Sequence, residues 1–98
     1  MGFFTSNKNK STKSLYSGGN GSSIETAIII NEADWILGIR AEYDYIIEKY
    51  GEVNKGWKLQ KQGTLNQSGR TFDILNIELP NSESKSIYFD ITNFHGKF

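Results

Sequence analysis

Residues 36–51, ILGIRAEYDYIIEKYG, decide the fold of this chain. The large apolar side chains of this stretch recur at the spacing of one face of an α-helix: Ile36, Ile39, Tyr43, Ile46, Ile47 and Tyr50. The charged residues fall on the other side of that helix, where we expect solvent: Arg40, Glu42, Asp44, Glu48 and Lys49. The segment therefore predicts one amphipathic helix that covers a core with its isoleucines and tyrosines.

Two glycines set the expected limits of this helix. Gly51 follows Tyr50 directly, at the position where glycine commonly ends a helix. Gly38 weakens the first turn, because glycine has a low helix propensity. We therefore expect the regular helix over residues 39–50, with residues 35–37 in the connection that precedes it.

Short apolar segments on both sides of the helix predict β-strands. The β-branched run AIII at residues 27–30 is bounded by polar residues and predicts a short buried strand. After the helix, three segments separated by turn residues predict further strands at 57–65, 71–79 and 86–92. Gly63 indicates a bulge or a close backbone approach in the first of these three.

The second strand of the three departs from simple alternation. Leu75, Ile77 and Leu79 alternate, whereas Phe72 and Ile74 are out of phase with them. The strand is therefore expected either to bury both faces near its start or to carry a bulge.

These elements predict an α+β fold with two layers, in the order β-α-β-β-β, with one helix packed on an antiparallel sheet. The first strand may pair with either edge of the three-stranded meander. Residues 1–22 are rich in Ser, Asn, Lys and Gly and predict a flexible polar tail. Residues 23–98 then form the single folded domain.

Composition narrows the chemistry that we expect. The 98 residues include no cysteine and one histidine, which removes disulfides and thiolate sites and leaves no recognisable metal or cofactor motif. No stretch has the apolar length of a secretory signal or a membrane span. We therefore expect a cytoplasmic protein without cofactor, metal or membrane partner.

Charge is segregated along the chain although the net charge is zero. Residues 24–53 carry a net charge of −5, and residues 54–71 carry +4 from Lys55, Lys58, Lys61 and Arg70. This layout predicts attraction between an acidic and a basic element inside the molecule. A neutral total disfavours nucleic acid as a partner.

His95 is the one side chain whose ordinary pKa suits general acid–base catalysis near neutral pH. It follows the last predicted strand and stands next to Gly96, outside any nucleophile motif. We expect a surface or rim position for it. An enzyme centred on His95 with Asp90 or Asp73 is the alternative.

Asp73 and Asp90 stand between large apolar residues in predicted strands, where aspartate is uncommon. Outward-facing strand positions account for both. A buried ion pair with Arg40 or Arg70, or a charge that binds a partner, stays open for each.

Several aromatic residues do not all fit one inward-facing parity. Exposed aromatic side chains commonly anchor protein partners. The sequence therefore predicts protein-binding residues among the following: Trp35, Tyr45, Trp57, Tyr88 and Phe94.

The segments GSSIETAIII, GIRAEYDYIIEKYG and FDILNIEL, with the closing IYFDITNFHGKF, resemble a family of small uncharacterised bacterial proteins. In that family a Gly-Ser-Ser segment opens the domain and a YFDI-type strand closes it. The resemblance implies a bacterial cytoplasmic domain and transfers no catalytic residue. The order of elements is also similar to that of cystatin-like folds, in topology alone.

From these features we expect a non-enzymatic protein-binding module of the immunity or accessory type. Besides the His95 enzyme, the alternative is a homodimer that associates through its own sheet.

Overall fold

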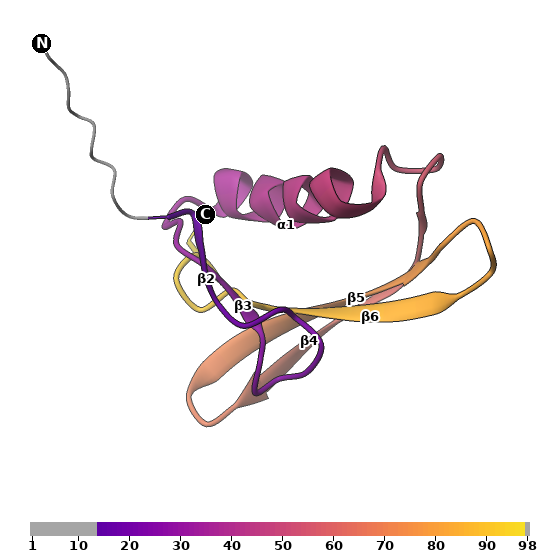
Figure 1. Cartoon of the computed structure of the whole chain (residues 1–98). Helices are drawn as coiled ribbons and strands as arrows, with labels where there is room; N and C mark the ends of the chain where they lie inside the picture. Colours follow the sequence, from indigo (N-terminus) through magenta and orange to yellow (C-terminus); the bar gives the residue numbers. More distant parts are fainter. Residues whose placement is uncertain (1–13, 98) are drawn as a thin grey trace, which may run out of the picture.

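The computed structural model describes residues 14–97 and contains one helix and five strands. Their bounds are β2 Tyr16–Gly18, β3 Ile28–Ile30, α1 Trp35–Tyr50, β4 Lys58–Gln67, β5 Arg70–Glu78 and β6 Ser84–Asp90. The helix lies across one face of the sheet, so the domain has two layers (Figure 1). The predicted α+β class and the order β-α-β-β-β are confirmed, with β2 as an additional strand.

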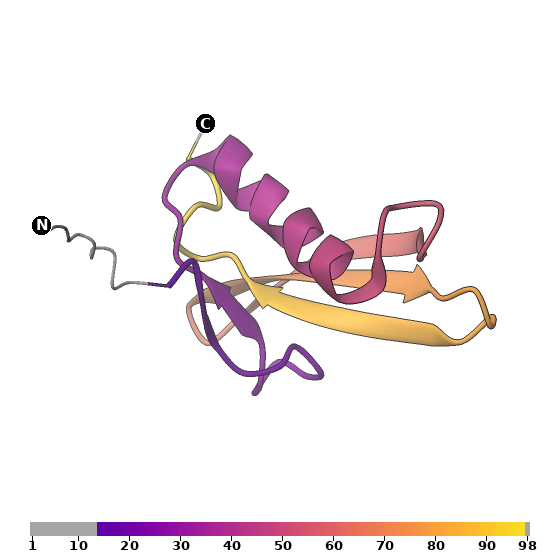
Figure 2. The same ribbon diagram turned by 45° about the horizontal axis from the view of Figure 1, so that its top comes forward.

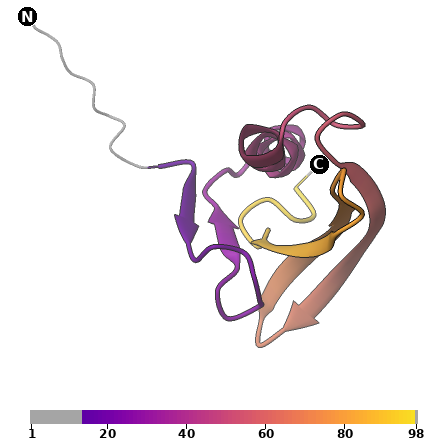
Figure 3. The same ribbon diagram turned by 45° about the vertical axis from the view of Figure 1, so that its right-hand side comes forward.

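The sheet has the strand order β2-β3-β6-β5-β4. The meander of β4, β5 and β6 is antiparallel, as predicted. β3 pairs with β6 in parallel, so the expectation of a purely antiparallel sheet is wrong. α1 carries the chain back along the sheet, so β4 runs in the same direction as β3. After two antiparallel hairpins β6 has that direction again and therefore pairs with β3 in parallel. Figure 3, seen nearly along the helix, shows the sheet curling beneath α1.

The expected polar tail needs correction at its C-terminal end. Tyr16–Gly18 forms β2, which pairs antiparallel with β3. The Tyr16 hydroxyl also donates a hydrogen bond to the Ala41 carbonyl oxygen of the helix at 2.7 Å. Residues 1–13 of the predicted tail lie outside the described residues. The folded unit thus begins before residue 23.

The helix begins four residues earlier than expected. Asp34 has an extended backbone and accepts a hydrogen bond from the Leu37 backbone N–H at 2.9 Å, which caps the first turn. This cap offsets the low helix propensity of Gly38. Gly51 ends the helix with a φ of 103°, as predicted.

The buried face of the helix differs from the predicted one. Gly38, Ala41, Glu42 and Ile46 are its buried residues, whereas Ile36 is 64% exposed. Gly38 matters because a Cβ there would come within 2.3 Å of the Phe94 ring. Gly38 and Ala41 are small, so core side chains can approach the helix backbone closely at these positions. A helical pattern defined by large apolar residues alone does not include them.

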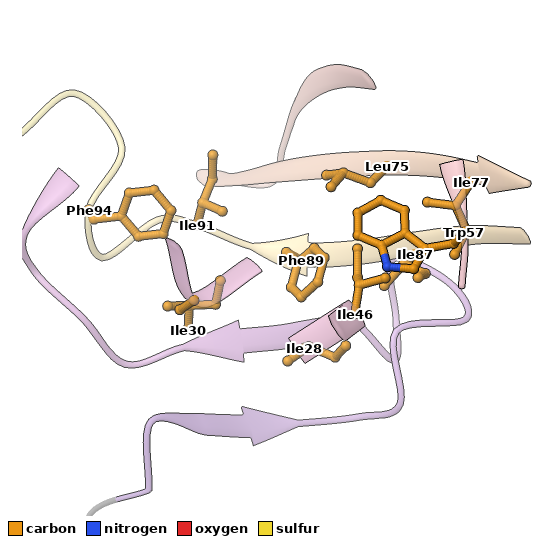
Figure 4. Close-up of a cluster of buried hydrophobic side chains, with 11 residues drawn as sticks. Ile28, Ile30, Ile46, Trp57, Leu75, Ile77, Ile87, Phe89, Ile91 and Phe94 are labelled. Carbon is orange, nitrogen blue, oxygen red and sulfur yellow. The ribbon is translucent and has the colours of Figure 1, made fainter. Parts of the chain in front are cut away.

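The core lies between the helix and the concave side of the sheet (Figure 2). Ile28 and Ile30 come from β3, Leu75 and Ile77 from β5, and Phe89 from β6 (Figure 4). Alternate residues of the last two strands point inward, as predicted. Phe72 and Asp73 are both buried although they are adjacent. β5 therefore buries both faces near its start, one of the two expected arrangements.

The irregularity in β4 is not at the predicted place. The register with β5 shifts between Leu59 and Lys61, and not at Gly63. A Cβ built at Gly63 would meet no atom within 4 Å, so no close approach occurs there either. The glycine therefore sits in the open part of the strand.

Candidate protein-binding edge

β4 forms one lateral edge of the sheet. It pairs with β5 on one side, and no strand of the described residues pairs with its other side. All ten residues, Lys58–Gln67, are exposed. Ten residues is at the upper end of usual strand lengths. The result is a long row of backbone N–H and C=O groups that face solvent, which is a template for another strand.

A tight hairpin fixes this edge in place. Ser68 and Gly69 connect β4 to β5 and have φ values of 54° and 77°. Two successive positive φ values are typical of the type I′ turn, whose twist matches that of paired strands. The turn therefore sets the register from the pair Gln67 and Arg70 back along β4.

Protection against strand addition is confined to the first half of β4. A bulge between Leu59 and Lys61, together with Lys58 and Lys61, disfavours pairing there. Residues 62–67, QGTLNQ, contain no charge and no proline, and their register with β5 is regular. This second half is therefore open to a partner strand.

The expected attraction between the acidic segment 24–53 and the basic segment 54–71 is limited, among the described residues, to one exposed local ion pair, Lys55 with Glu52 at 3.6 Å. The ion pairs among the described residues are Lys55 with Glu52, Arg70 with Asp90, and Lys85 with Glu83. None of them joins α1 to β4. The positive charges of Lys58 and Lys61 thus lack an ion-pair partner within residues 14–97.

Two of the predicted binding aromatics are core residues. Trp57 is 1% exposed, and its indole N–H donates to the Gly51 carbonyl oxygen at 2.8 Å. Phe94 is 2% exposed and packs on Gly38. Their side chains close the two ends of the core (Figure 4) and are not available to a partner. The prediction that they bind a partner is corrected on this ground.

The other three predicted binding aromatics, Tyr45, Tyr88 and Trp35, are less deeply buried. Tyr45 is half-buried, with its ring centroid 5.2 Å from that of Tyr16 and 5.8 Å from that of Phe89. Tyr88 is also half-buried. Trp35 is 36% exposed and begins α1, next to Ile36 and Leu37. These aromatics do not gather into one surface with β4.

Glu42 and Asp73 form a buried pair of acids that the sequence did not reveal. Glu42 is 0% exposed and points from α1 towards β5, where Asp73 is 5% exposed. Burial, and then the neighbouring carboxylate of Asp73, raise the pKa of Glu42 to about 10. Both Glu42 carboxyl oxygens and Asp73 Oδ1 are buried without a hydrogen-bond partner among the described residues, so a proton on Glu42 removes a charge that burial would otherwise leave uncompensated. Gln62 Nε2 donates to Asp73 Oδ2 at 2.9 Å.

Asp90 occupies the opposite face of the sheet and has a cation beside it. Arg70 Nε donates to Asp90 Oδ2 at 2.9 Å, and Thr92 donates to Asp90 Oδ1 from its hydroxyl and its backbone N–H. Burial alone would raise the pKa of Asp90. The hydrogen bonds from Arg70 and Thr92 outweigh burial and lower that pKa. The buried ion pair with Arg70 is one of the alternatives left open by the sequence.

His95 is exposed in the turn that follows β6, as expected. Its backbone N–H donates to the Ile91 carbonyl oxygen at 2.9 Å. The Asp90 carboxylate is engaged by Arg70 and Thr92, and the Asp73 carboxylate accepts a hydrogen bond from Gln62. The structure therefore does not bring His95 together with either acid of the alternative catalytic site.

Within residues 14–97, no three histidine, cysteine or acidic side chains gather so that they could hold a metal ion. The single helix of this part of the chain lacks the length and apolarity needed to cross a membrane. Comparison of the chain with protein-family models, curated proteins and solved structures found no match.

Proposed function

We propose that this protein is a non-enzymatic binding module that takes up an extended segment of another protein along the outer edge of β4. The observation that carries the proposal is a ten-residue edge strand with every side chain exposed, one side of which pairs with no strand of residues 14–97. Strand addition uses such an edge, because main-chain hydrogen bonds supply affinity and alternate side chains supply specificity. An immunity or accessory role fits a module of this kind.

The uneven protection of β4 supports the proposal. Residues 58–61 carry the bulge and both lysines, whereas residues 62–67 carry neither a charge nor a bulge. An edge that serves only as a boundary needs protection along its full length. The open half thus leaves room for about six residues of a partner.

The experiment is selection of binders from a displayed library of random decapeptides on the immobilised domain. We expect enriched peptides that perturb backbone amide signals of β4 in a nuclear magnetic resonance titration and leave those of β2 unchanged. Absence of enriched peptides, or perturbations confined to other elements, would contradict the proposal.

Two proline variants provide the matched test. Backbone groups of successive strand residues point to opposite sides, so one of Gly63 and Thr64 directs its N–H outward. Proline at the outward position removes that donor while the pairing with β5 persists. The folded variant among Gly63→Pro and Thr64→Pro should lose peptide binding. Undiminished binding by that variant refutes strand addition, and if neither folds, the amide titration of the native protein decides.

A further inference from the structure

The first half of β4 carries two positively charged side chains, Lys58 and Lys61, that are exposed to solvent. Lys58 lies opposite Glu78 on β5, and Lys61 lies opposite Asn76. Lys61 therefore has no acid facing it across the β4–β5 pair. Arg70 is occupied by Asp90, and Lys55 contacts Glu52 at 3.6 Å. Positive charge thus concentrates on the first half of β4.

Both lysines point to the same face of the sheet. Glu78 and Asn76 are two residues apart on β5, so they share one face, and cross-strand partners share a face as well. The bulge accounts for the spacing of three between Lys58 and Lys61 on β4. Residues at positions i and i+2 of an extended segment also share one face, so two such carboxylates can lie on the face that carries both lysines.

From this geometry we infer that the partner pairs with residues 62–67 and continues beyond them as an acidic segment, whose carboxylates at positions i and i+2 lie beside Lys58 and Lys61. This inference rests on the proposed strand addition at β4. Opposite charges directly across a strand pair are favourable, and like charges are unfavourable. The lysines thus select an acidic strand while they oppose a basic one.

A second copy of the chain is a poor partner for the same reason. β4 contains no acidic residue, so a second β4 strand offers no carboxylate to Lys58 and Lys61. Self-association through this edge therefore leaves both lysines without a counter-charge, whereas an acidic partner supplies one.

Single-stranded nucleic acid also carries negative charge, but it needs aromatic rings on which its bases stack. Trp57, the aromatic residue next to β4, is 1% exposed and cannot provide that surface. The basic edge is accordingly assigned to an acidic polypeptide.

The test uses three synthetic decapeptides of alternating Thr and Val in which two positions, i and i+2, are both Glu, both Gln or both Lys. Fluorescence anisotropy should show that the Glu peptide binds about tenfold more tightly than the Lys peptide, since each charge pair contributes a few-fold. Added salt should reduce this difference.

The double variant Lys58→Glu/Lys61→Glu should invert the order of the Glu and Lys peptides. The control Lys85→Glu/Lys97→Glu makes the same change of net charge at exposed sites outside β4 and should preserve the order. A variant that failed to invert the order would overturn the inference.

The outcomes separate the two proposals. Equal binding of all three peptides refutes the acidic partner and leaves strand addition intact. Failure of every peptide to bind refutes strand addition itself. Tighter binding of a dT decanucleotide than of the Glu peptide, or a dimer in sedimentation that the Lys58→Glu/Lys61→Glu variant changes, also overturns the inference.

Discussion

Asp90 and Glu42 are both buried carboxylic acids, with exposed fractions of 5% and 0%, but their surroundings differ. Asp90 accepts a hydrogen bond from Arg70, so it is held in its charged form. Glu42 meets the acid Asp73 and no cation, so it keeps its proton. The two faces of one small sheet thus accommodate a buried acid by a counter-charge in one case and by protonation in the other.

The difference between Glu42 and Asp90 has its largest expected effect on how the free energy of unfolding depends on pH. The raised pKa of Glu42 means that the folded state binds an extra proton between about pH 4.5 and 10. The contribution of Glu42 to the free energy of unfolding is complete below pH 4.5. It is lost as the pH rises, by at most about 1.4 kcal/mol per pH unit. The lowered pKa of Asp90 acts in the opposite sense, and its contribution is lost in acid.

We therefore expect the free energy of unfolding to peak near pH 4–5 and to fall by several kcal/mol towards pH 8. Urea unfolding at pH 3, 4.5, 6 and 8 measures this profile. A free energy of unfolding that is constant or increases from pH 5 to pH 8 would show that Glu42 is ionised in the folded protein.

The variant Glu42→Gln should remove most of this slope. Glutamine has no carboxyl proton to lose, and its amide can donate to Asp73 Oδ1, a buried acceptor without a partner among residues 14–97 of the native protein. The variant should match the native protein at pH 4 and exceed its stability at pH 8 by about 2–4 kcal/mol. Glu48→Gln, on the exposed face of the same helix, is the matched control and should leave the slope unchanged.

Loss of the counter-charge tests the other acid. Arg70→Met should lower the free energy of unfolding by about 1–2 kcal/mol at pH 7, discounted because the Arg70 side chain is 44% exposed. The deficit should shrink as the pH falls through the lowered pKa of Asp90, because the protonated carboxyl no longer needs the cation. Lys85→Met, which breaks the surface pair with Glu83, should change stability by less than about 0.5 kcal/mol. Equal effects of the two variants in chemical denaturation would indicate that Asp90 needs no cation.

The smallest effect concerns the hydrogen bond from Gln62 to Asp73. Gln62→Ala should lower the free energy of unfolding by about 1 kcal/mol, because Asp73 Oδ2 loses its one hydrogen-bond donor among residues 14–97. Gln67→Ala on the same strand should cost less, and thermal unfolding of the two variants side by side measures the difference. A larger loss for Gln67→Ala would show that strand pairing, and not the acid pair, governs this edge.

The elements of the fold were predictable because hydrophobic period and turn residues act locally. The change from a helical spacing to alternation after Gly51 located α1 and the meander. The start of α1 was missed because Asp34 caps it, and β2 was missed because three polar-flanked residues owe their strand to pairing with β3. Neither interaction has a local periodic signal.

The candidate site was less predictable. Glu42 was assigned to the exposed face because the predicted stripe used large apolar residues, whereas packing at Gly38 and Ala41 rotates the buried face towards it. Trp57 and Phe94 were assigned to a binding surface because the core expected for so small a domain was too small to contain them, whereas both are buried. The absence of acids from residues 54–71 was visible in the sequence. Its meaning depended on the strand order, which leaves β4 outermost.

The position of β6 in the sheet also determines when folding can finish. β6 follows every other strand in the sequence, yet it lies third among five, between β3 and β5. On the ribosome, the β4–β5 hairpin can form early, but the nascent β2–β3 pair has no neighbour until residue 90 has been synthesised. Domain assembly therefore waits for the synthesis of β6, and until then the isoleucines of β3 lack the strand that covers them.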